Sequence, residues 1–424
     1  MGRLFGTSGV RKRVTELTDD FALDLGRALG STVKSTVAIG RDCRDSGPRL
    51  EGKFVEGLTS AGRDVVRLGL VPTPTVGVAT AQLGVGVVVT ASHNPPEYNG
   101  FKFFSKKGAF NPKEEDAVEA VFHSGRFASG RGGVKDADYV GRHVDLIVKK
   151  VGEADGVKVL LDCAGGAGSV VTPRVLDAMN CRSTIINDRR DGVFPHPLEP
   201  TAKNLEGTCA QVAGSGVDIA FAHDGDADRT CAIGADGRLI EWDTFLTVLA
   251  SQSDKVVTTV DASMRIEEYC RRVYRVAVGD VAVADGIREH KAGFGGEPSG
   301  TYLFPDIHIF PDGVATVAKA TKLVADGKFY SLVKDIPSYP MERVKISCLP
   351  HEKEKIMSGL EGILCGEDYS DVDGIRITYD YGWILLRPSG TEDFVRITAE
   401  AKSQTKLDEL VVRGKAWIKQ AHHS

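Results

Sequence analysis

Short apolar runs of strand length alternate with longer amphipathic stretches along most of this chain. The apolar runs lie at 37–40, 85–89, 157–161, 217–221 and 256–260. Strands that are apolar on both faces are typical of sheets covered by helices on both sides. The first three quarters of the sequence therefore predict layered α/β structure with largely buried strands.

A helix end, a short turn and a strand recur at three places in this part of the chain, 61–69, 180–186 and 272–279. The recurrence predicts three related α/β units, although the similarity is too faint to establish common descent. Beyond residue 341 the pattern changes. A strand is followed by a helix at 352–364, strands at 375–379, 383–386 and 395–399, and a final helix at 405–421. This order predicts a small α+β domain with one helical layer.

Three stretches of turn residues suggest where the domains end. The Gly/Arg-rich segment 124–133 is typical of an exposed connection, a turn follows Gly237, and two prolines lie within 336–340. A chain of 424 residues also exceeds the size at which a single core keeps growing. We therefore expect four domains, at 1–138, 139–238, 239–336 and 337–424.

Composition and charge narrow the class of protein. The chain is 42% hydrophobic and 26% charged, which is typical of a globular protein, and its net charge of -5 disfavours a general binder of nucleic acid or membrane surfaces. No apolar run approaches eighteen residues, and no apolar signal core follows the first residues. The 8 cysteines form no C-x-x-C pair. We expect a cytoplasmic protein with reduced thiols and no nucleic-acid or membrane partner.

Ser92 is the first candidate for chemistry. It follows a glycine-bearing strand, 84–91, and precedes Asn94-Pro95-Pro96, which cannot continue in regular structure. A hydroxyl at the carboxyl end of a parallel strand is placed where ligands bind in α/β sheets, so we expect it to be exposed. The alternative is a turn serine that caps its own backbone.

Three alternating carboxylates follow another apolar strand. Asp224, Asp226 and Asp228 are separated only by Gly225 and Ala227, so they can converge on one point. Hard oxygen ligands favour Mg²⁺. A calcium loop of the EF-hand type is excluded because its sixth and twelfth positions would be Arg229 and Ala235. A solvated acidic turn remains the alternative.

Two further loops suit the binding of a phosphorylated ligand. Arg387-Pro388-Ser389-Gly390-Thr391 offers backbone N–H groups, hydroxyls and a guanidinium fork for phosphate, and Arg396 on the next strand can reach the same place. Glu297 and Ser299, in the segment 295–300, can accept hydrogen bonds from neighbouring hydroxyls. The segment 387–391 could instead be an ordinary hairpin turn. The segment 295–300 could be a loop without a special role.

Two nucleotide-binding patterns are absent or incomplete. No Gly-Lys-Ser/Thr occurs, so there is no P-loop. Gly166-Ala167-Gly168 follows a strand, but Val171 stands where the third glycine of a dinucleotide fingerprint belongs.

Together these segments resemble the signature set of the α-D-phosphohexomutase family. The set consists of 6–11, 90–95, 99–102, 224–229, 296–300 and 387–392, in the family's order and across nearly the whole chain. The resemblance implies three similar mixed α/β domains and a distinct C-terminal α+β domain around a central active-site cleft.

The resemblance also implies roles for individual residues. Ser92 would carry the transferred phosphate, and its phosphoserine oxygen would complete a Mg²⁺ site with Asp224, Asp226 and Asp228. His93 and Lys102 would serve in proton transfer or charge stabilisation, and Arg11 and Arg229 would lie near phosphate. The substrate would be bound by Thr7, Ser8, Glu297, Ser299, Arg387, Ser389, Gly390, Thr391 and Arg396.

The activity implied by the resemblance is interconversion of hexose 1-phosphate and hexose 6-phosphate, with hexose 1,6-bisphosphate as intermediate and activator. Pro298 and the segment Val278-Gly279-Asp280 resemble the archaeal-type branch that contains phosphoglucosamine mutases, so glucosamine phosphate is the leading substrate. Phosphomannomutase or phosphoglucomutase activity, alone or combined, remains the alternative. A non-catalytic sugar-phosphate sensor and a Mg²⁺-dependent sugar phosphatase are alternatives from other classes. We expect a monomer or homodimer, and His223 has no assigned role.

Overall fold

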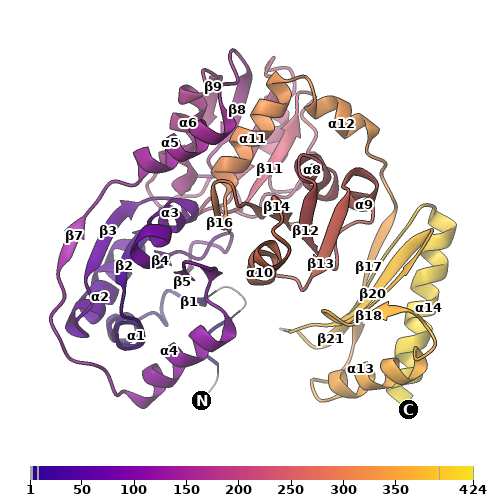
Figure 1. Cartoon of the computed structure of the whole chain (residues 1–424), viewed down its shortest axis with the longest axis horizontal. Helices are drawn as coiled ribbons and strands as arrows, with labels where there is room; N and C mark the ends of the chain where they lie inside the picture. The colour runs from indigo at the N-terminus through magenta and orange to yellow at the C-terminus, as the bar shows by residue number, and fades with distance from the viewer. Residues whose placement is uncertain (1–2, 7–8, 391, 424) are drawn as a thin grey trace.

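The computed structural model describes residues 3–6, 9–390 and 392–423, which form four β-sheets covered by helices. In Figure 1 the four units follow one another in an arc, from the indigo N-terminal sheet to the yellow C-terminal one. The predicted α/β fold with a distinct C-terminal α+β unit is confirmed. No helix of the described part has the length and apolar character needed to cross a membrane.

The first sheet has seven strands in the order β1-β5-β4-β2-β3-β7, with β6 beside β5. Alternate residues of its central strand face two different cores, since Val37 and Ile39 pack with α1 and α2 whereas Ala38 packs with α3. The strands are β1 (Val10–Arg13), β2 (Thr36–Arg41), β3 (Val65–Leu70), β4 (Gly84–Val89), β5 (Tyr98–Ser105), β6 (Gly108–Ala109) and β7 (Val134–Asp136). The helices are α1 (Asp19–Thr32), α2 (Gly47–Ser60), α3 (Thr73–Leu83) and α4 (Pro112–Ser124).

Helix α4 shows how local sequence sets an element's bounds. The Asn111 side chain accepts from the backbone of Glu114, whose own side chain accepts from the Asn111 N–H, and Pro112 occupies the first turn. The helix ends at Gly125, whose φ of 62° is left-handed. The segment 124–133 was expected to be an exposed connection, and directly after it Val134–Asp136 forms β7, an unpredicted strand that pairs with β3.

The second and third sheets follow in chain order. The second contains β8 (Lys158–Asp162), β9 (Arg182–Ile186), β10 (Ile219–His223) and β11 (Thr230–Gly234), with α5 (Val140–Val151), a 3₁₀ turn (Ala167–Val170), α6 (Thr172–Ala178) and α7 (Glu206–Val212). The third contains β12 (Lys255–Thr259), β13 (Arg272–Val276), β14 (Phe294–Gly296), β15 (Tyr302–Phe304) and β16 (His308–Pro311), with α8 (Trp242–Ala250), α9 (Ile266–Tyr269), α10 (Asp280–His290), α11 (Gly313–Ala325) and α12 (Phe329–Asp335). The strand predicted from 217 begins two residues later, at Ile219.

The three sheets share one strand arrangement. Three parallel strands are followed by an antiparallel fourth in the orders β3-β2-β4-β5, β9-β8-β10-β11 and β13-β12-β14-β15. The three similar units expected from the sequence are therefore present. The boundaries at 138, 238 and 336 remain a prediction.

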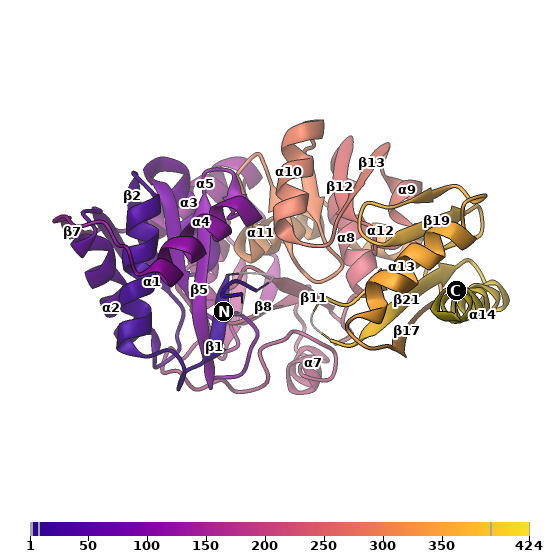
Figure 2. The same ribbon diagram turned by 90° about the horizontal axis from the view of Figure 1, so that it is seen from below.

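The fourth sheet is antiparallel, in the order β17-β21-β20-β19-β18. Helices α13 and α14 pack against each other and share a core with β19, β20 and β21, and in Figure 2 they lie together beside this sheet. The elements are β17 (Met341–Ser347), α13 (Glu352–Ile363), β18 (Tyr369–Ser370), β19 (Ile375–Tyr379), β20 (Gly382–Pro388), β21 (Phe394–Ala401) and α14 (Gln404–His423).

Buried Glu400 joins the fourth unit to the third. Its carboxylate accepts from the Ser263 hydroxyl at 2.5 Å, from the Met264 N–H at 2.8 Å and from the Trp383 indole at 2.7 Å. Several hydrogen bonds to one buried carboxylate offset its loss of water. The contact fixes β21 against the segment after β12.

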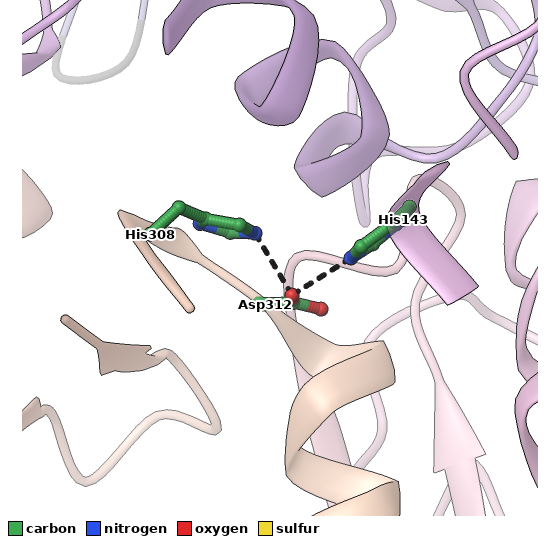
Figure 3. A group of neighbouring side chains, drawn as sticks. All are labelled: His143, His308 and Asp312. Atoms are coloured by element: carbon green, nitrogen blue, oxygen red, sulfur yellow. Dashed lines mark hydrogen bonds and ion pairs between the residues drawn. The ribbon is translucent and has the colours of Figure 1, made fainter. Parts of the chain in front are cut away.

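A buried cluster of His143, His308 and Asp312 joins the first three units (Figure 3). His143 on α5 and His308 on β16 each place Nε2 3.0 Å from Asp312 Oδ2, and His143 Nδ1 lies 2.9 Å from Thr75 Oγ1 on α3. The Phe310 N–H donates to His308 Nδ1, so the ring's own proton lies on Nε2. A metal ligand needs a lone pair at that nitrogen. This proton disfavours metal binding at His308, and the His143–Asp312 hydrogen bond and the His308–Asp312 contact connect the units.

Candidate active site

Three loops at equivalent positions meet at the centre of the molecule. Each connects the third strand of its sheet to the antiparallel fourth: Ser92 lies between β4 and β5, Asp224 to Arg229 between β10 and β11, and Glu297 to Thr301 between β14 and β15. Each loop contains a left-handed residue, with φ of 51° at Ser92, 53° at Ala227 and 85° at Gly300. A shared topology thus brings distant sequence segments to one place.

Ser92 is buried, with 1% of its surface exposed, so the expected exposed hydroxyl is wrong. The loop Asp224 to Arg229 of the second unit covers it, and Ser92 Oγ donates to Asp224 Oδ2 at 2.6 Å; we name this loop the metal loop after the cation site predicted there. Sequence reasoning about one strand could not include a loop from another sheet. The hydroxyl still lines an internal cavity, where a ligand can reach it.

Arg44 holds the Ser92 loop in shape, and the sequence analysis did not identify it. This fully buried guanidinium donates to four carbonyl oxygens, those of Ser92, Asn94, Pro95 and Tyr98, at 2.6 to 2.8 Å. Its Nε donates to Asp42 Oδ2, which balances the charge. A buried arginine with all its donors used rigidifies a loop. The available signal was the Arg-Asp-x-Arg-Asp run at 41–45, which begins with the last residue of the buried strand β2.

Asp224, Asp226 and Asp228 converge as predicted, with one oxygen from each within 4.8 Å of the others. Burial, reinforced by the two neighbouring carboxylates, raises the pKa of Asp224 well above its usual range. In the described residues, Asp226 Oδ1 and Asp228 Oδ1 are buried without a hydrogen-bond partner. Oxygen ligands that face one another without donors fit a hard divalent cation. These residues therefore suit Mg²⁺.

Lys102 on β5 offsets part of this negative charge. Its Nζ donates to Asp226 Oδ2 at 2.6 Å and also to Asp228 Oδ2. Burial alone would lower the pKa of Lys102, but the two aspartates outweigh it and raise the pKa. The Thr73 hydroxyl at the start of α3 also donates to Asp226 Oδ2, at 2.5 Å, and was not predicted. The first unit thus holds the metal loop of the second.

Basic groups surround Ser92 on the cavity side. Arg11 and Arg229 line the cavity, and Arg11 Nη1 donates to Asn94 Oδ1 at 3.1 Å. His93 Nδ1 lies 3.4 Å from Ser92 Oγ. Burial first, and then the charges of Arg229, Arg11 and Lys102, lower the pKa of His93 to about 3. His93 is therefore neutral at physiological pH, and the positive charge comes from the two arginines and the lysine.

His223 supports the metal loop from below. It is fully buried at the end of β10, with Nε2 2.9 Å from Thr172 Oγ1 and Nδ1 3.3 Å from the Arg229 carbonyl oxygen. Burial lowers the pKa of His223 to about 4, so the ring is neutral. His223 thus links Thr172, the first residue of α6, to Arg229, the last residue of the metal loop. We regard it as a residue that positions this loop.

Glu297 and Ser299 line the same cavity as Ser92, as the sequence suggested. Glu297 Oε1 accepts from the Gly279 N–H at 2.8 Å. Burial, together with the charge of Asp280, raises the pKa of Glu297 to about 7. The third unit therefore presents acceptor oxygens opposite the serine and the basic groups.

The predicted phosphate loop lies between β20 and β21, outside the residues that line this cavity. Arg387 and Arg396 lie at facing positions of the two strands, and Ser389 and Gly390 lie in the connection that follows β20. Arg387 Nε donates to Asp373 Oδ1 at 2.8 Å, and the other Asp373 oxygen accepts from the Val278 N–H at 2.9 Å. Asp373 thus connects this loop to the cavity wall. The predicted ligands Thr7, Ser8 and Thr391 lie outside the described residues.

Lys353 was not predicted for this loop. Its Nζ donates to the carbonyl oxygens of Ser389 at 3.0 Å and Glu392 at 2.6 Å. It therefore adds a positive charge beside the turn, from the helix α13.

Comparison with known proteins agrees with this arrangement. Four sequence models described as phosphoglucomutase/phosphomannomutase domains match the chain: α/β/α domain I at residues 2–129, α/β/α domain II at 137–237, α/β/α domain III at 242–339, and the C-terminal domain at 344–413. The chain belongs to the phosphoglucomutase/phosphomannomutase family. Two archaeal relatives are similar to it over nearly their whole length. A probable phosphoglucosamine mutase of Methanobrevibacter smithii is 40% identical over 96% of both chains, and the phosphoglucosamine mutase of Methanocaldococcus jannaschii is 38% identical over 99% of both.

A solved structure has the same fold over the whole length. The phosphoglucomutase/phosphomannomutase family protein of Burkholderia thailandensis superposes with a TM-score of 0.90 and 27% identity, covering 99% of this chain and 97% of its own.

Proposed function

We propose that this protein is a phosphohexomutase that interconverts the 1-phosphate and 6-phosphate of a hexose, with glucosamine phosphate as its main substrate. The observation that carries the proposal is the contact of Ser92 with the cluster of three aspartates, beside a cavity that Ser92, Asp228, the basic groups and Glu297 line together. Family membership and the names of the archaeal relatives support it.

Phosphoryl transfer requires a nucleophile that can hold the group between its two destinations. In the proposed cycle phosphorylated Ser92 gives its phosphoryl group to a sugar hydroxyl, so the bond from phosphorus to Ser92 Oγ breaks as one to the sugar oxygen forms. The hexose 1,6-bisphosphate then turns end for end. Its other phosphoryl group returns to Ser92, and the isomeric monophosphate leaves.

The charges of the cavity suit this cycle. A phosphoserine and a sugar phosphate each carry roughly -1.5 to -2 at neutral pH. Arg11, Arg229 and Lys102 lie around Ser92 and stabilise negative charge on the phosphoryl oxygens. His93 Nδ1 lies 3.4 Å from Ser92 Oγ, but with a pKa of about 3 the neutral ring accepts a proton only weakly near pH 7. Charge stabilisation around Ser92 therefore comes from Arg11, Arg229 and Lys102, with His93 as a polar neighbour of the serine oxygen.

Mg²⁺ would be held by Asp224, Asp226 and Asp228, with an oxygen of phosphorylated Ser92 completing the site. When bound, it supplies positive charge to the phosphoryl group during transfer. Arg44 keeps the Ser92 backbone fixed against the metal loop. Arg387 and Arg396 would bind the phosphate that is not reacting, in either orientation of the bisphosphate.

A direct test compares conversion of glucosamine, glucose and mannose 6-phosphates to their 1-phosphates, with the matching bisphosphate as activator. The proposal expects interconversion that requires Mg²⁺ and ceases after chelation, fastest with glucosamine phosphate. Release of inorganic phosphate without interconversion would instead identify a phosphatase and overturn the proposal. Activity that persists with a chelator would remove the aspartates from metal binding.

A further inference from the structure

The wall contributed by the third unit carries an excess of negative charge. Asp261 after β12, Asp280 at the start of α10 and Glu297 after β14 all line the cavity that contains Ser92. The charges of Asp280 and Asp261 both act on Glu297, and each outweighs the opposing charge of Arg229. This wall is therefore acidic although the proposed substrate is a phosphate ester.

The backbone holds two of these carboxylates together. Gly279, with a φ of 130°, precedes Asp280 and donates its N–H to Glu297 Oε1 at 2.8 Å. Burial raises the pKa of both Asp280 and Glu297, and like charge from neighbouring carboxylates contributes at each. The like charge at Glu297 comes from Asp280 and that at Asp280 from Asp228, the latter partly offset by Lys102, and a cation beside either carboxylate favours its ionised form.

Basic groups also line this cavity. Arg11, Lys102 and Arg229 are among the lining residues, with Ser92, where the proposed phosphoryl transfer takes place. A ligand that complements the whole cavity needs both an anionic group and a cationic group. A hexose phosphate with only hydroxyl groups lacks the cation, whereas an amino sugar phosphate carries an ammonium group on its ring.

We propose that Asp280, assisted by Glu297, accepts the ammonium group of an amino sugar phosphate and so determines the sugar specificity of this site. The inference rests on the proposed function and deepens it. Glu297 would otherwise accept only from hydroxyls, which every hexose phosphate offers. Asp280 supplies the charge that distinguishes an amino group from a hydroxyl.

A structural role for Asp280 gives a different expectation. An acidic side chain in the first turn of a helix stabilises the helix dipole, and Asp280 is the first residue of α10. Loss of that role would lower thermal stability and affect all sugars alike. Loss of a partner for the ammonium group would instead change the ratio of kcat/KM between the amino sugar phosphate and the hexose phosphate.

The test is the substrate ratio of an Asp280→Asn variant, which keeps the side-chain shape and removes the charge. The readout is kcat/KM for glucosamine 6-phosphate divided by kcat/KM for glucose 6-phosphate, together with the unfolding temperature. Asp285→Asn is the matched control, because Asp285 lies on the same helix but is exposed and pairs with Arg288. We expect the ratio to fall by about tenfold or more in Asp280→Asn, to remain at the wild-type value in Asp285→Asn, and to recover partly in Asp280→Glu.

Binding provides a second readout that does not need turnover. Calorimetric titration of the wild-type protein should show tighter binding of glucosamine 6-phosphate than of glucose 6-phosphate, and Asp280→Asn should reduce that difference. An unchanged ratio and an unchanged binding difference in a folded Asp280→Asn variant would overturn this inference alone. Wild-type protein that interconverts no hexose phosphate would refute the proposed function, while the binding difference would still report on Asp280.

Discussion

Replacement of Lys102 by methionine tests the charge balance around the metal loop. The Lys102 side chain is only 6% exposed, and its ammonium group contacts Asp226, which is 0% exposed, and Asp228. Methionine keeps most of the apolar stem but leaves two carboxylates without their cation. Breaking a buried ion pair in this way costs about 3–5 kcal/mol.

The loss of stability in Lys102→Met has an upper limit, because Asp226 can take up a proton instead of remaining charged and unpaired. A carboxyl group with an ordinary pKa of 3.8 can be protonated at pH 7 for about 4 kcal/mol, since each pH unit corresponds to about 1.4 kcal/mol. In the wild type, burial would raise the pKa of Asp226, but Lys102 outweighs it and holds the pKa below its usual range. That stabilisation is present above the unfolded-state pKa and is lost as pH falls. The effect of Lys102→Met should therefore approach about 4 kcal/mol at pH 7 and shrink towards pH 4.

The assay is urea unfolding of Lys102→Met and of Lys106→Met, each with and without Mg²⁺. Lys106 is a matched control, since it is exposed in the turn between β5 and β6. Without Mg²⁺ we expect a loss of roughly 3–4 kcal/mol for Lys102→Met only. Mg²⁺ should recover more stability in this variant than in wild type, because the metal binds the folded state and no longer competes with the ammonium group. A loss below about 1 kcal/mol, or an equal response to Mg²⁺ in both, would refute the proposed charge balance.

Three other changes have distinct expected outcomes. Ser92→Ala should lower the interconversion rate by roughly four orders of magnitude while calorimetry still detects substrate binding, and near-wild-type turnover would exclude a nucleophilic serine. Arg387→Ala should raise KM about tenfold or more with a smaller change in kcat, and unchanged steady-state constants would remove Arg387 from phosphate binding. Burial raises the pKa of Asp243 to about 7, so its contribution to stability is lost as pH rises through 7. Asp243→Asn keeps an acceptor for the Ser263 N–H and should raise the unfolding temperature more at pH 8 than at pH 4, whereas a pH-independent effect would contradict the shift.

The fold could be predicted well because its signals are local. The apolar runs and the changed pattern after residue 341 each reflect short-range physics. The sequence did not predict β7, because Val134–Asp136 is short and exposed, has no apolar run, and pairs with β3. Its existence depends on a partner distant in sequence.

In the candidate site, too, some features could be predicted from the sequence and others could not. The spacing of Asp224, Asp226 and Asp228 places three carboxylates within one turn, so their convergence could be predicted. The burial of Ser92 could not, because a loop from another sheet covers it. The role of Arg44 could not be predicted either. Its four carbonyl partners lie about 50 residues from it in the sequence, and only the folded loop brings them together.

The central claim is that Ser92 carries the phosphoryl group between the two halves of the reaction. Intact-mass analysis of active protein, taken immediately after mixing with hexose 1,6-bisphosphate, measures this directly, and peptide mapping locates the modified residue. The account predicts a species heavier by one phosphate, located at Ser92 and absent from Ser92→Ala. Active protein that never contains this species, or that contains it at another residue, would contradict the account.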